Sequence, residues 1–513
     1  MEIGKGNLDI NQFNGIVSGN EKVQLSSEAL KRVSDSFAFL QQFAKDKVIY
    51  GINTGFGPMA QYRIPDEKGR DLQLNLIRSH ASGHGEPLKA ADVRALMLCR
   101  LNTLMLGYSG VHPDVVHCLT SFLNEEVTPF IPEHGGVGAS GDLVQLAHLA
   151  HTMIGEGKVV HNGRIIPVRE LPGVERLKFT DIHIREGLAV MNGTAAMSGI
   201  GLHNITRATR LVRWSTQLSA IINELMESYD DHVSLELNQA KKHRGQQVVA
   251  AAMRALFSES KLIKLRTDKM YKGTNGEAVF KEKVQEYYSL RCVPQILGPV
   301  LDAVRHAERI LLEEVNSAND NPIIDVASEN VFHGGNFHGD YAAFEMDKLK
   351  IGITKLTMLA ERQLNYLVNH KLNEKLPPFL NLGELGFNFG LQGMQFTAVS
   401  TTAENQTLSN PMYIHSIPNN NDNQDVVSMG ANAALLAQRV ITNAQRVLAI
   451  EALAVCQAVD CLRCEDKLSG AGRELYKLVR AQIPAFIEDS PGTDWINAMV
   501  EIMNHHNPIE LEK

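Results

Sequence analysis

Three stretches of this chain, residues 202–244, 300–320 and 431–469, contain neither glycine nor proline. Those two residues most often end or interrupt a helix, and an average helix has only about 11–12 residues. A fourth stretch, residues 340–369, has apolar side chains at the spacing of one helix face: Leu349, Ile353, Leu356, Ala360, Leu364 and Leu367. The pattern predicts a mainly α fold whose core is a bundle of long helices.

The first part of the chain differs, because glycine and proline recur there and segments with a helix-like pattern alternate with segments typical of loops. One β-hairpin is predicted, since the turn signal Asn162-Gly163 lies between the apolar pairs at 159–160 and 165–166. We therefore predict two domains. Residues 1–193 form a smaller mixed N-terminal region, and residues 194–513 form the long-helix bundle.

Composition excludes several classes of protein. The 513 residues are 44% hydrophobic and 21% charged, which is typical of a folded chain, and the net charge of -8 provides no basic stripe for nucleic acid. No stretch approaches the roughly 20 apolar residues that span a bilayer, and the first residues do not resemble a signal peptide. The six cysteines are scattered, which favours a reducing cytoplasm over a disulfide framework.

The sequence contains no complete metal-binding pattern. Cys461 and Cys464 form a CxxC pair, but the second pair that a four-ligand zinc site needs does not follow. Two histidine pairs have helical spacing without an H-E-x-x-H arrangement: His80 with His84, and His148 with His151. We expect the chain to hold no metal, to bind no nucleic acid and to cross no membrane.

The glycine-rich loop at residues 134–142 precedes an apolar segment, 143–149, that reads as a helix which Asp142 or Ser140 could cap. Such a loop could be a tight connector or could bind a phosphate at the helix N-terminus. The phosphate reading is weak, because the loop lacks the Gly-Lys-Ser/Thr ending of a Walker motif. The Rossmann reading is also weak, since no strong strand precedes the loop.

A third interpretation rests on the tripeptide Ala139-Ser140-Gly141 within this loop. The Gly141 nitrogen can attack the carbonyl carbon of Ala139, because glycine permits that close approach. Water is lost, and Ser140 then loses its hydroxyl group as a second water. The product is a methylidene-imidazolone, abbreviated MIO, which is an electrophile formed without any external cofactor.

The loop GGVGASGDLVQLAH resembles the MIO loop of the histidine, phenylalanine and tyrosine ammonia-lyases, and the resemblance extends from about residue 50 to about residue 430. It implies elimination of ammonia from an aromatic L-amino acid to give a trans α,β-unsaturated acid. The substrate amine would react with the MIO electrophile; an older proposal, in which the ring reacts instead, stays open. Tyr50, in the segment 50–57, would be the general base; its ordinary pKa of about 10 means that neighbours must activate it.

Other segments match the family's substrate-binding positions. Arg291 in the segment 285–292 would bind the substrate carboxylate through its forked guanidinium, although such an arginine is more often a surface charge. The segment 316–322 also matches, and we interpret it mainly as structural loop packing. The remaining residues that the resemblance places around the substrate are Gln285, Tyr288, Asn192, Asn336, Phe337, Glu404 and Gln424.

The residues expected to select the substrate resemble those of two different groups of lyases. The pair Ser79-His80 is typical of histidine lyases, whereas the run Asn423-Gln424-Asp425 resembles the phenylalanine and tyrosine lyases. In a bacterial tyrosine lyase branch that keeps the pair, His80 would meet the phenol hydroxyl and disfavour phenylalanine. We expect conversion of L-tyrosine to p-coumarate, with histidine to urocanate as the alternative.

The resemblance also implies a homotetramer whose active sites combine residues from more than one chain. The long helices further resemble the fumarase and aspartase architecture, but the catalytic Gly-Ser-Ser loop of those enzymes is absent from the sequence. Two other hypotheses remain: an MIO aminomutase would use the same residues and add the amine back, and a non-catalytic helical scaffold would not need these loops together.

Overall fold

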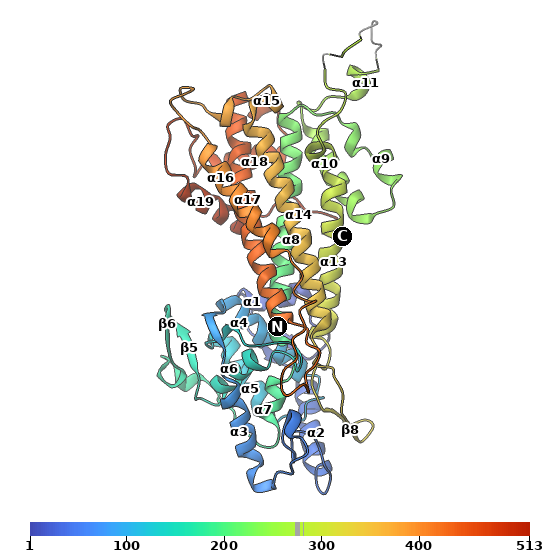
Figure 1. Ribbon diagram of the computed structural model, residues 1–513, viewed down its shortest axis with the longest axis vertical. Helices are drawn as coiled ribbons and strands as arrows, with labels where there is room; N and C mark the ends of the chain where they lie inside the picture. Colours follow the sequence, from blue (N-terminus) through green and yellow to red (C-terminus); the bar gives the residue numbers. More distant parts are fainter. Residues whose placement is uncertain (272–277, 281, 513) are drawn as a thin grey trace. The chain divides into compact units, whose positions relative to one another are not determined.

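The computed structural model describes residues 1–271, 278–280 and 282–512. The structure is 58% helix and 7% strand, which confirms the predicted mainly α fold. Figure 1 shows the long helices α8, α13, α14 and α17 and the shorter elements of the N-terminal region. Their bounds are α8 (Ala195–Leu225), α13 (Val293–Val315), α14 (Asp340–Val368) and α17 (Gly430–Leu462).

The chain forms two compact units, each built from separate stretches of sequence. Unit 1 contains Met1–Thr206, Ala307–Asp347 and Pro411–Gln438, and unit 2 contains Arg207–His306, Lys348–Asn410 and Arg439–Lys513. This division differs from the single boundary predicted at residue 193. Two later stretches, Ala307–Asp347 and Pro411–Gln438, belong to unit 1 together with the N-terminal region.

Unit 1 contains short helices and two-stranded sheets. Helix α4 is largely buried, and its residues 95–104 are all shielded from solvent. The helices wholly inside this unit are α1 (Ile10–Val17), α2 (Ser27–Phe43), α3 (Gly69–His80), α4 (Ala90–Leu104), α5 (Pro113–Asn124), α6 (Leu143–Met153) and α7 (Glu186–Met191). The sheets pair β1 (Glu2–Ile3) with β2 (Gln24–Leu25), β3 (His84–Pro87) with β4 (Pro132–His134), β5 (Lys158–His161) with β6 (Arg164–Pro167) and β7 (Ile323–Asp325) with β8 (Asn330–Phe332).

The predicted hairpin is present as the antiparallel pair of β5 and β6. Val160 pairs with Ile165, and Val159 pairs with Ile166. The two turn residues both have positive φ, 50° for Asn162 and 73° for Gly163. That backbone conformation is the one that an Asn-Gly turn favours, so the local signal was sufficient to predict the hairpin.

Unit 2 is built from helices. The six apolar positions predicted within residues 340–369 are all buried, with exposures of 2% or less, which confirms the helical period. The helices wholly inside this unit are α9 (Leu235–Gln239), α10 (Arg244–Glu259), α11 (Arg266–Lys269), α12 (Tyr288–Arg291), α15 (His370–Asn373), α16 (Gln392–Leu408), α18 (Gly470–Arg480) and α19 (Thr493–His505).

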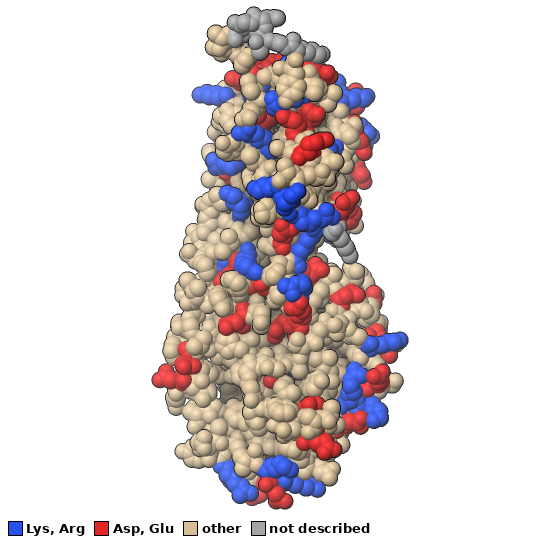
Figure 2. Space-filling view, turned by 90° about the vertical axis from the view of Figure 1, so that its right-hand side faces the viewer, with Lys and Arg blue, Asp and Glu red and all other residues tan. Residues whose placement is uncertain are grey.

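The hydropathy of the helices and the distribution of surface charge relate to the predictions about membranes and nucleic acid. Within the described part of the chain, no helix combines the length and the apolar character that crossing a membrane requires. On the face in Figure 2, Lys and Arg side chains are interspersed with Asp and Glu side chains rather than gathered into one stripe.

Candidate active site

The Ala139-Ser140-Gly141 tripeptide lies in the loop between β4 and α6. Gly141 has a positive φ of 70°, a conformation that glycine adopts without strain. A Cβ atom at this position would lie 2.1 Å from the carbonyl oxygen of Gly193. The loop therefore packs so closely against the turn at 192–193 that only glycine fits at position 141.

Hydrogen bonds from distant segments hold this loop in place. The Asn192 side chain donates to the carbonyl oxygen of Ser140 at 2.9 Å, and the Gln424 side chain donates to the Ser140 hydroxyl at 2.7 Å. The Ser428 hydroxyl donates to the carbonyl oxygen of Gly138 at 2.9 Å. Two predicted residues, Asn192 and Gln424, thus contact the serine of the tripeptide directly.

Asp142, the residue after the tripeptide, has a structural role that the sequence did not predict. We expected its side chain, or that of Ser140, to cap α6, but the Asp142 carboxylate makes no such bond. It instead accepts the N–H groups of Ala196 at 2.8 Å and Met197 at 2.9 Å, in the first turn of α8. Burial raises the pKa of this carboxyl to about 7, against the opposing effect of the two backbone donors.

A cavity of about 510 Å³ in unit 1 brings many of the predicted residues together. Three asparagines that were not assigned to the site from the sequence also line it, namely Asn321, Asn420 and Asn423. The Asn-rich stretch 419–423 was visible as a signal for the last two. The predicted residues that line the cavity are Tyr50, Ser79, His80, Ser140, Asn192, Phe337 and Gln424.

Tyr50 is fixed by its ring and by its hydroxyl group. The ring packs edge-on against Phe56, with centroids 6.1 Å apart and an interplanar angle of 82°. The hydroxyl oxygen accepts the N–H of Gly57 at 3.0 Å. The ring contact and the hydrogen bond together fix the position of this hydroxyl group in the cavity.

Buried Gln73 ties the backbone next to Tyr50 to the helix that leads to Asn192. Its amide nitrogen donates to the carbonyl oxygen of Gly51 at 2.8 Å, and its amide oxygen accepts the N–H of Leu188 at 2.8 Å. Leu188 belongs to α7, which ends at Met191. One buried side chain therefore sets the position of two walls of the cavity.

Ser79 and His80 lie at the end of α3. Nδ1 of His80 is 3.0 Å from the carbonyl oxygen of Leu76 and 3.0 Å from the Ser79 hydroxyl. Because a carbonyl oxygen can only accept, the first contact places a proton on Nδ1. In the neutral ring Nε2 is then an acceptor, which can receive a hydrogen bond from a substrate hydroxyl or N–H group.

Asn336 is separated from its neighbour Phe337. Phe337 lines the cavity, whereas Asn336 is exposed and is not among the lining residues. The Asn336 side chain donates to the carbonyl oxygen of Ala318 at 3.2 Å. In this structure Asn336 therefore binds the 316–322 segment.

Four predicted substrate-binding residues belong to unit 2. Gln285, Tyr288 and Arg291 line a cavity of about 570 Å³, in which the Arg291 guanidinium lies 4.9 Å from the centre of the Tyr288 ring. Glu404 lies on α16, where its carboxylate accepts a hydrogen bond from Asn443 at 2.9 Å. None of the four is among the residues that line the unit 1 cavity in the described structure.

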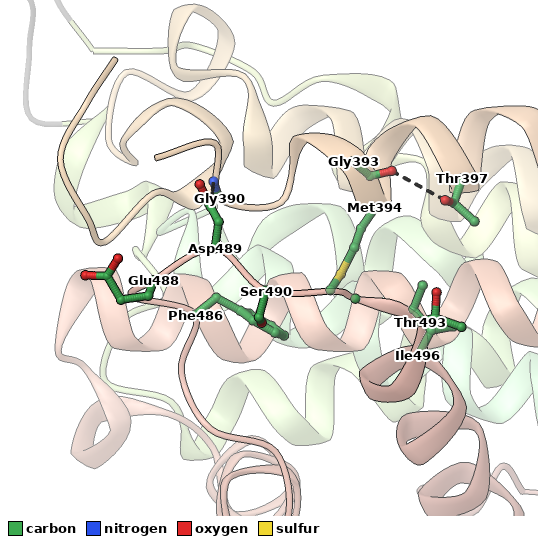
Figure 3. Close-up of a pocket in the computed structure, with 11 residues that line it drawn as sticks. Gly390, Gly393, Met394, Thr397, Phe486, Glu488, Asp489, Ser490, Thr493 and Ile496 are labelled. Carbon is green, nitrogen blue, oxygen red and sulfur yellow. Dashed lines mark hydrogen bonds between the residues drawn. The ribbon is translucent and has the colours of Figure 1, made fainter. Parts of the chain in front are cut away.

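A smaller hollow of about 200 Å³ lies in unit 2 near the start of α16 (Figure 3). The Asp489 carboxylate accepts the N–H of Phe389 at 2.9 Å and that of Gly390 at 3.2 Å. The dashed line in the figure joins the Thr397 hydroxyl to the carbonyl oxygen of Gly393. These contacts fix the turn before α16, and none of the predicted site residues lines this hollow.

The chain matches the family model described as aromatic amino acid lyase over residues 8–481. It is 39% identical over 507 residues to a tyrosine ammonia-lyase of Cupriavidus metallidurans, which covers 97% of this chain and 94% of that protein. It is 37% identical over 483 residues to a histidine ammonia-lyase of Geobacillus thermodenitrificans, which covers 94% of this chain and 93% of that one.

Among solved structures, the tyrosine aminomutase from Streptomyces globisporus superposes with a TM-score of 0.95 at 34% identity and covers 100% of both chains. The helical fold and these relatives define an enzyme of the lyase and aminomutase class. The chain belongs to the aromatic amino acid lyase family.

Proposed function

We propose that this enzyme is an ammonia-lyase that converts L-tyrosine to p-coumarate and ammonia, with an MIO group formed from Ala139, Ser140 and Gly141. The observation that carries the proposal is the shared cavity of unit 1, which is lined by both Ser140 and Tyr50. A loop that can form an electrophile and a general base that can take a proton are the two parts that the elimination requires.

The tripeptide fits the formation of this group. Gly141 has no side chain to obstruct the approach of its nitrogen to the Ala139 carbonyl carbon, and its N–H donates to no acceptor among the described residues. Its nitrogen bonds to the Ala139 carbonyl carbon, and two waters leave in turn, the second from Ser140. Once formed, the group supplies an electrophile that ordinary side chains lack.

The other residues of the cavity orient the substrate and move one proton. Tyr50 acts as the general base that takes the proton from the carbon next to the amino-bearing carbon, and the Gly57 N–H holds its oxygen in position. Asn192 and Gln424 keep the Ser140 position fixed while the substrate is held in reach. The rigidity of these contacts supports an elimination in which both bonds to be broken are oriented.

The carboxylate-binding residues support a multi-chain site. Arg291, Gln285 and Tyr288 belong to unit 2, and none lines the unit 1 cavity in the described chain. We assign them, together with Glu404, to the active site of another copy within a homotetramer.

All six cysteines are free, which supports a cytoplasmic location.

His80 supports tyrosine as the substrate. Its Nε2 acceptor matches the phenol O–H of tyrosine, and phenylalanine would leave it without a partner. Histidine could also donate an N–H to it, so histidine ammonia-lyase activity remains the alternative. The distinction requires an experiment with purified protein.

The test offers L-tyrosine, L-histidine and L-phenylalanine separately and identifies the product from each. We expect p-coumarate from tyrosine as the main activity, and urocanate as the main product would replace the assignment. The Ser140→Ala variant is the control, because it keeps the fold but cannot form the group. Unchanged turnover by this variant, or a loop peptide whose mass shows no loss of two waters, would refute the mechanism.

One observation favours a second activity, the 2,3-aminomutase reaction. The solved structure with a TM-score of 0.95 is a tyrosine aminomutase. Such an enzyme would use the same residues and return the amine to the neighbouring carbon. Chromatography of the tyrosine reaction distinguishes the two, since a lyase accumulates p-coumarate and a mutase accumulates β-tyrosine.

A further inference from the structure

Two histidines and an aspartate form a cluster on unit 1 that does not line the cavity described above. His112, Asp114 and His183 each offer one ligand atom, and these atoms lie within 4.8 Å of one another. The two imidazole rings have centroids 4.3 Å apart, and the Asp114 carboxylate is 3.1 Å from Nδ1 of His112. We propose that this cluster binds a divalent transition-metal ion, with Zn²⁺ as the best match.

The backbone that carries the two histidines is held by one buried carboxylate. Glu186 has no solvent exposure. Its Oε1 atom accepts the N–H of His112 at 3.1 Å, and its Oε2 atom accepts the N–H of His183 at 2.8 Å. Because both ligand-bearing segments are tied to the same residue, their spacing is set before any ion binds.

The rings are ordered as well as the backbone. Phe37, on α2, packs edge-on against both imidazoles, with centroid distances of 5.0 Å to His112 and 5.8 Å to His183. Side chains that are already restrained lose little freedom when they bind an ion. In the part of the chain that the structure describes, no hydrogen bond to the ring nitrogens of His183 competes with a metal.

The donor set indicates the kind of ion. Imidazole nitrogens with a single carboxylate suit Zn²⁺ and its neighbours, whereas Mg²⁺ and Ca²⁺ prefer all-oxygen sites. Zinc bonds of about 2.0–2.2 Å in tetrahedral geometry place ligand atoms roughly 3.3 Å apart. The ligand atoms here all lie within 4.8 Å of one another, so rotation of the exposed His183 and Asp114 side chains is enough to bring them around one ion. Water or a small anion would complete the coordination.

The binding test uses untagged, full-length protein stripped of metal with EDTA and titrated with Zn²⁺ by calorimetry. We expect the His183→Ala variant to bind at least about tenfold more weakly. His112→Asn is the second variant, because asparagine keeps the acceptor that caps α5. His161→Ala, on the β5–β6 hairpin, is the matched control and should bind as the wild type does. Circular dichroism and turnover should stay unchanged in all three variants.

Two further readouts test the same site. Zn²⁺ should raise the Tm of the wild type in a saturable way, since an ion that binds only the folded state stabilises it, and Mg²⁺ should not. The rise should disappear in His183→Ala. Failure of the wild type to bind Zn²⁺, or equal binding by the wild type, His183→Ala and His112→Asn, would overturn the proposal. Neither result depends on the substrate of the enzyme.

Discussion

Replacing Tyr50 with phenylalanine separates its proposed chemical role from its packing role. The ring contact with Phe56 is kept, because phenylalanine has the same ring. Only the bond from the Gly57 N–H is lost, and one unsatisfied, partly buried N–H costs about 1 kcal/mol. A total stability on the order of 5–15 kcal/mol tolerates that loss, so the variant should remain folded.

The catalytic effect should be much larger. Loss of a positioned general base lowers the rate by about 10²–10⁴, which equals about 2.7–5.5 kcal/mol of barrier at about 1.36 kcal/mol per tenfold. The assay is the initial rate of p-coumarate release, measured on the same preparation as its thermal unfolding. Tyr62→Phe is the matched control, since Tyr62 is exposed and does not line the cavity. A Tyr50→Phe rate above one tenth of the wild-type rate, with tyrosine as substrate, would refute the assignment.

Three further variants test His80 and two buried charged groups. His80→Leu should lower kcat/KM for tyrosine by about 5–150-fold, the equivalent of about 1–3 kcal/mol for an unmatched polar group, and should shift preference towards phenylalanine; an unchanged ratio of the two kcat/KM values contradicts the role of His80. Burial raises the pKa of Glu451 well above its usual range. The folded protein then keeps the proton that the unfolded chain releases, so this residue costs stability as the pH rises above about 4.5, by up to about 1.4 kcal/mol per pH unit. Glu451→Gln should therefore stabilise the protein more at about pH 8 than at about pH 5 in urea unfolding; equal effects at both pH values contradict this reasoning. Arg185→Met breaks a buried ion pair with Asp320, in which both side chains have no exposure, and should cost about 3–5 kcal/mol in urea unfolding; an unchanged midpoint would show that the pair is not needed.

The helices could be predicted from local patterns, because the period of apolar residues determines which face is buried. The six positions in residues 340–369 show this. The end of α8 could not be predicted in the same way, since residues 202–244 contain no breaker. The helix stops at Leu225, and Glu227 soon follows with a positive φ of 51°. Tertiary contacts, rather than a turn residue, determine that ending.

Motifs identified many cavity residues, but they carried no information about spatial grouping. Ser140 and Gln424 are distant in sequence and meet in one hydrogen bond, and Arg291 lies in the other unit. The segment 316–322, interpreted as structural, is bound by the buried Arg185 guanidinium through Asp320. The cluster of His112 and His183 could not be predicted from the sequence, because ligand spacing is recognisable only when the ligands are close along the chain.

The bond between Ser428 and Gly138 spans 290 residues, which has a consequence for biosynthesis. At translation rates of about 5–20 residues per second, the ribosome needs roughly 15–60 s to reach Ser428 after it has added Gly138. During that interval the loop lacks the contacts that hold it. Nascent or truncated chains should therefore carry an unreacted tripeptide, and the proposed electrophile should form only in a nearly complete protein.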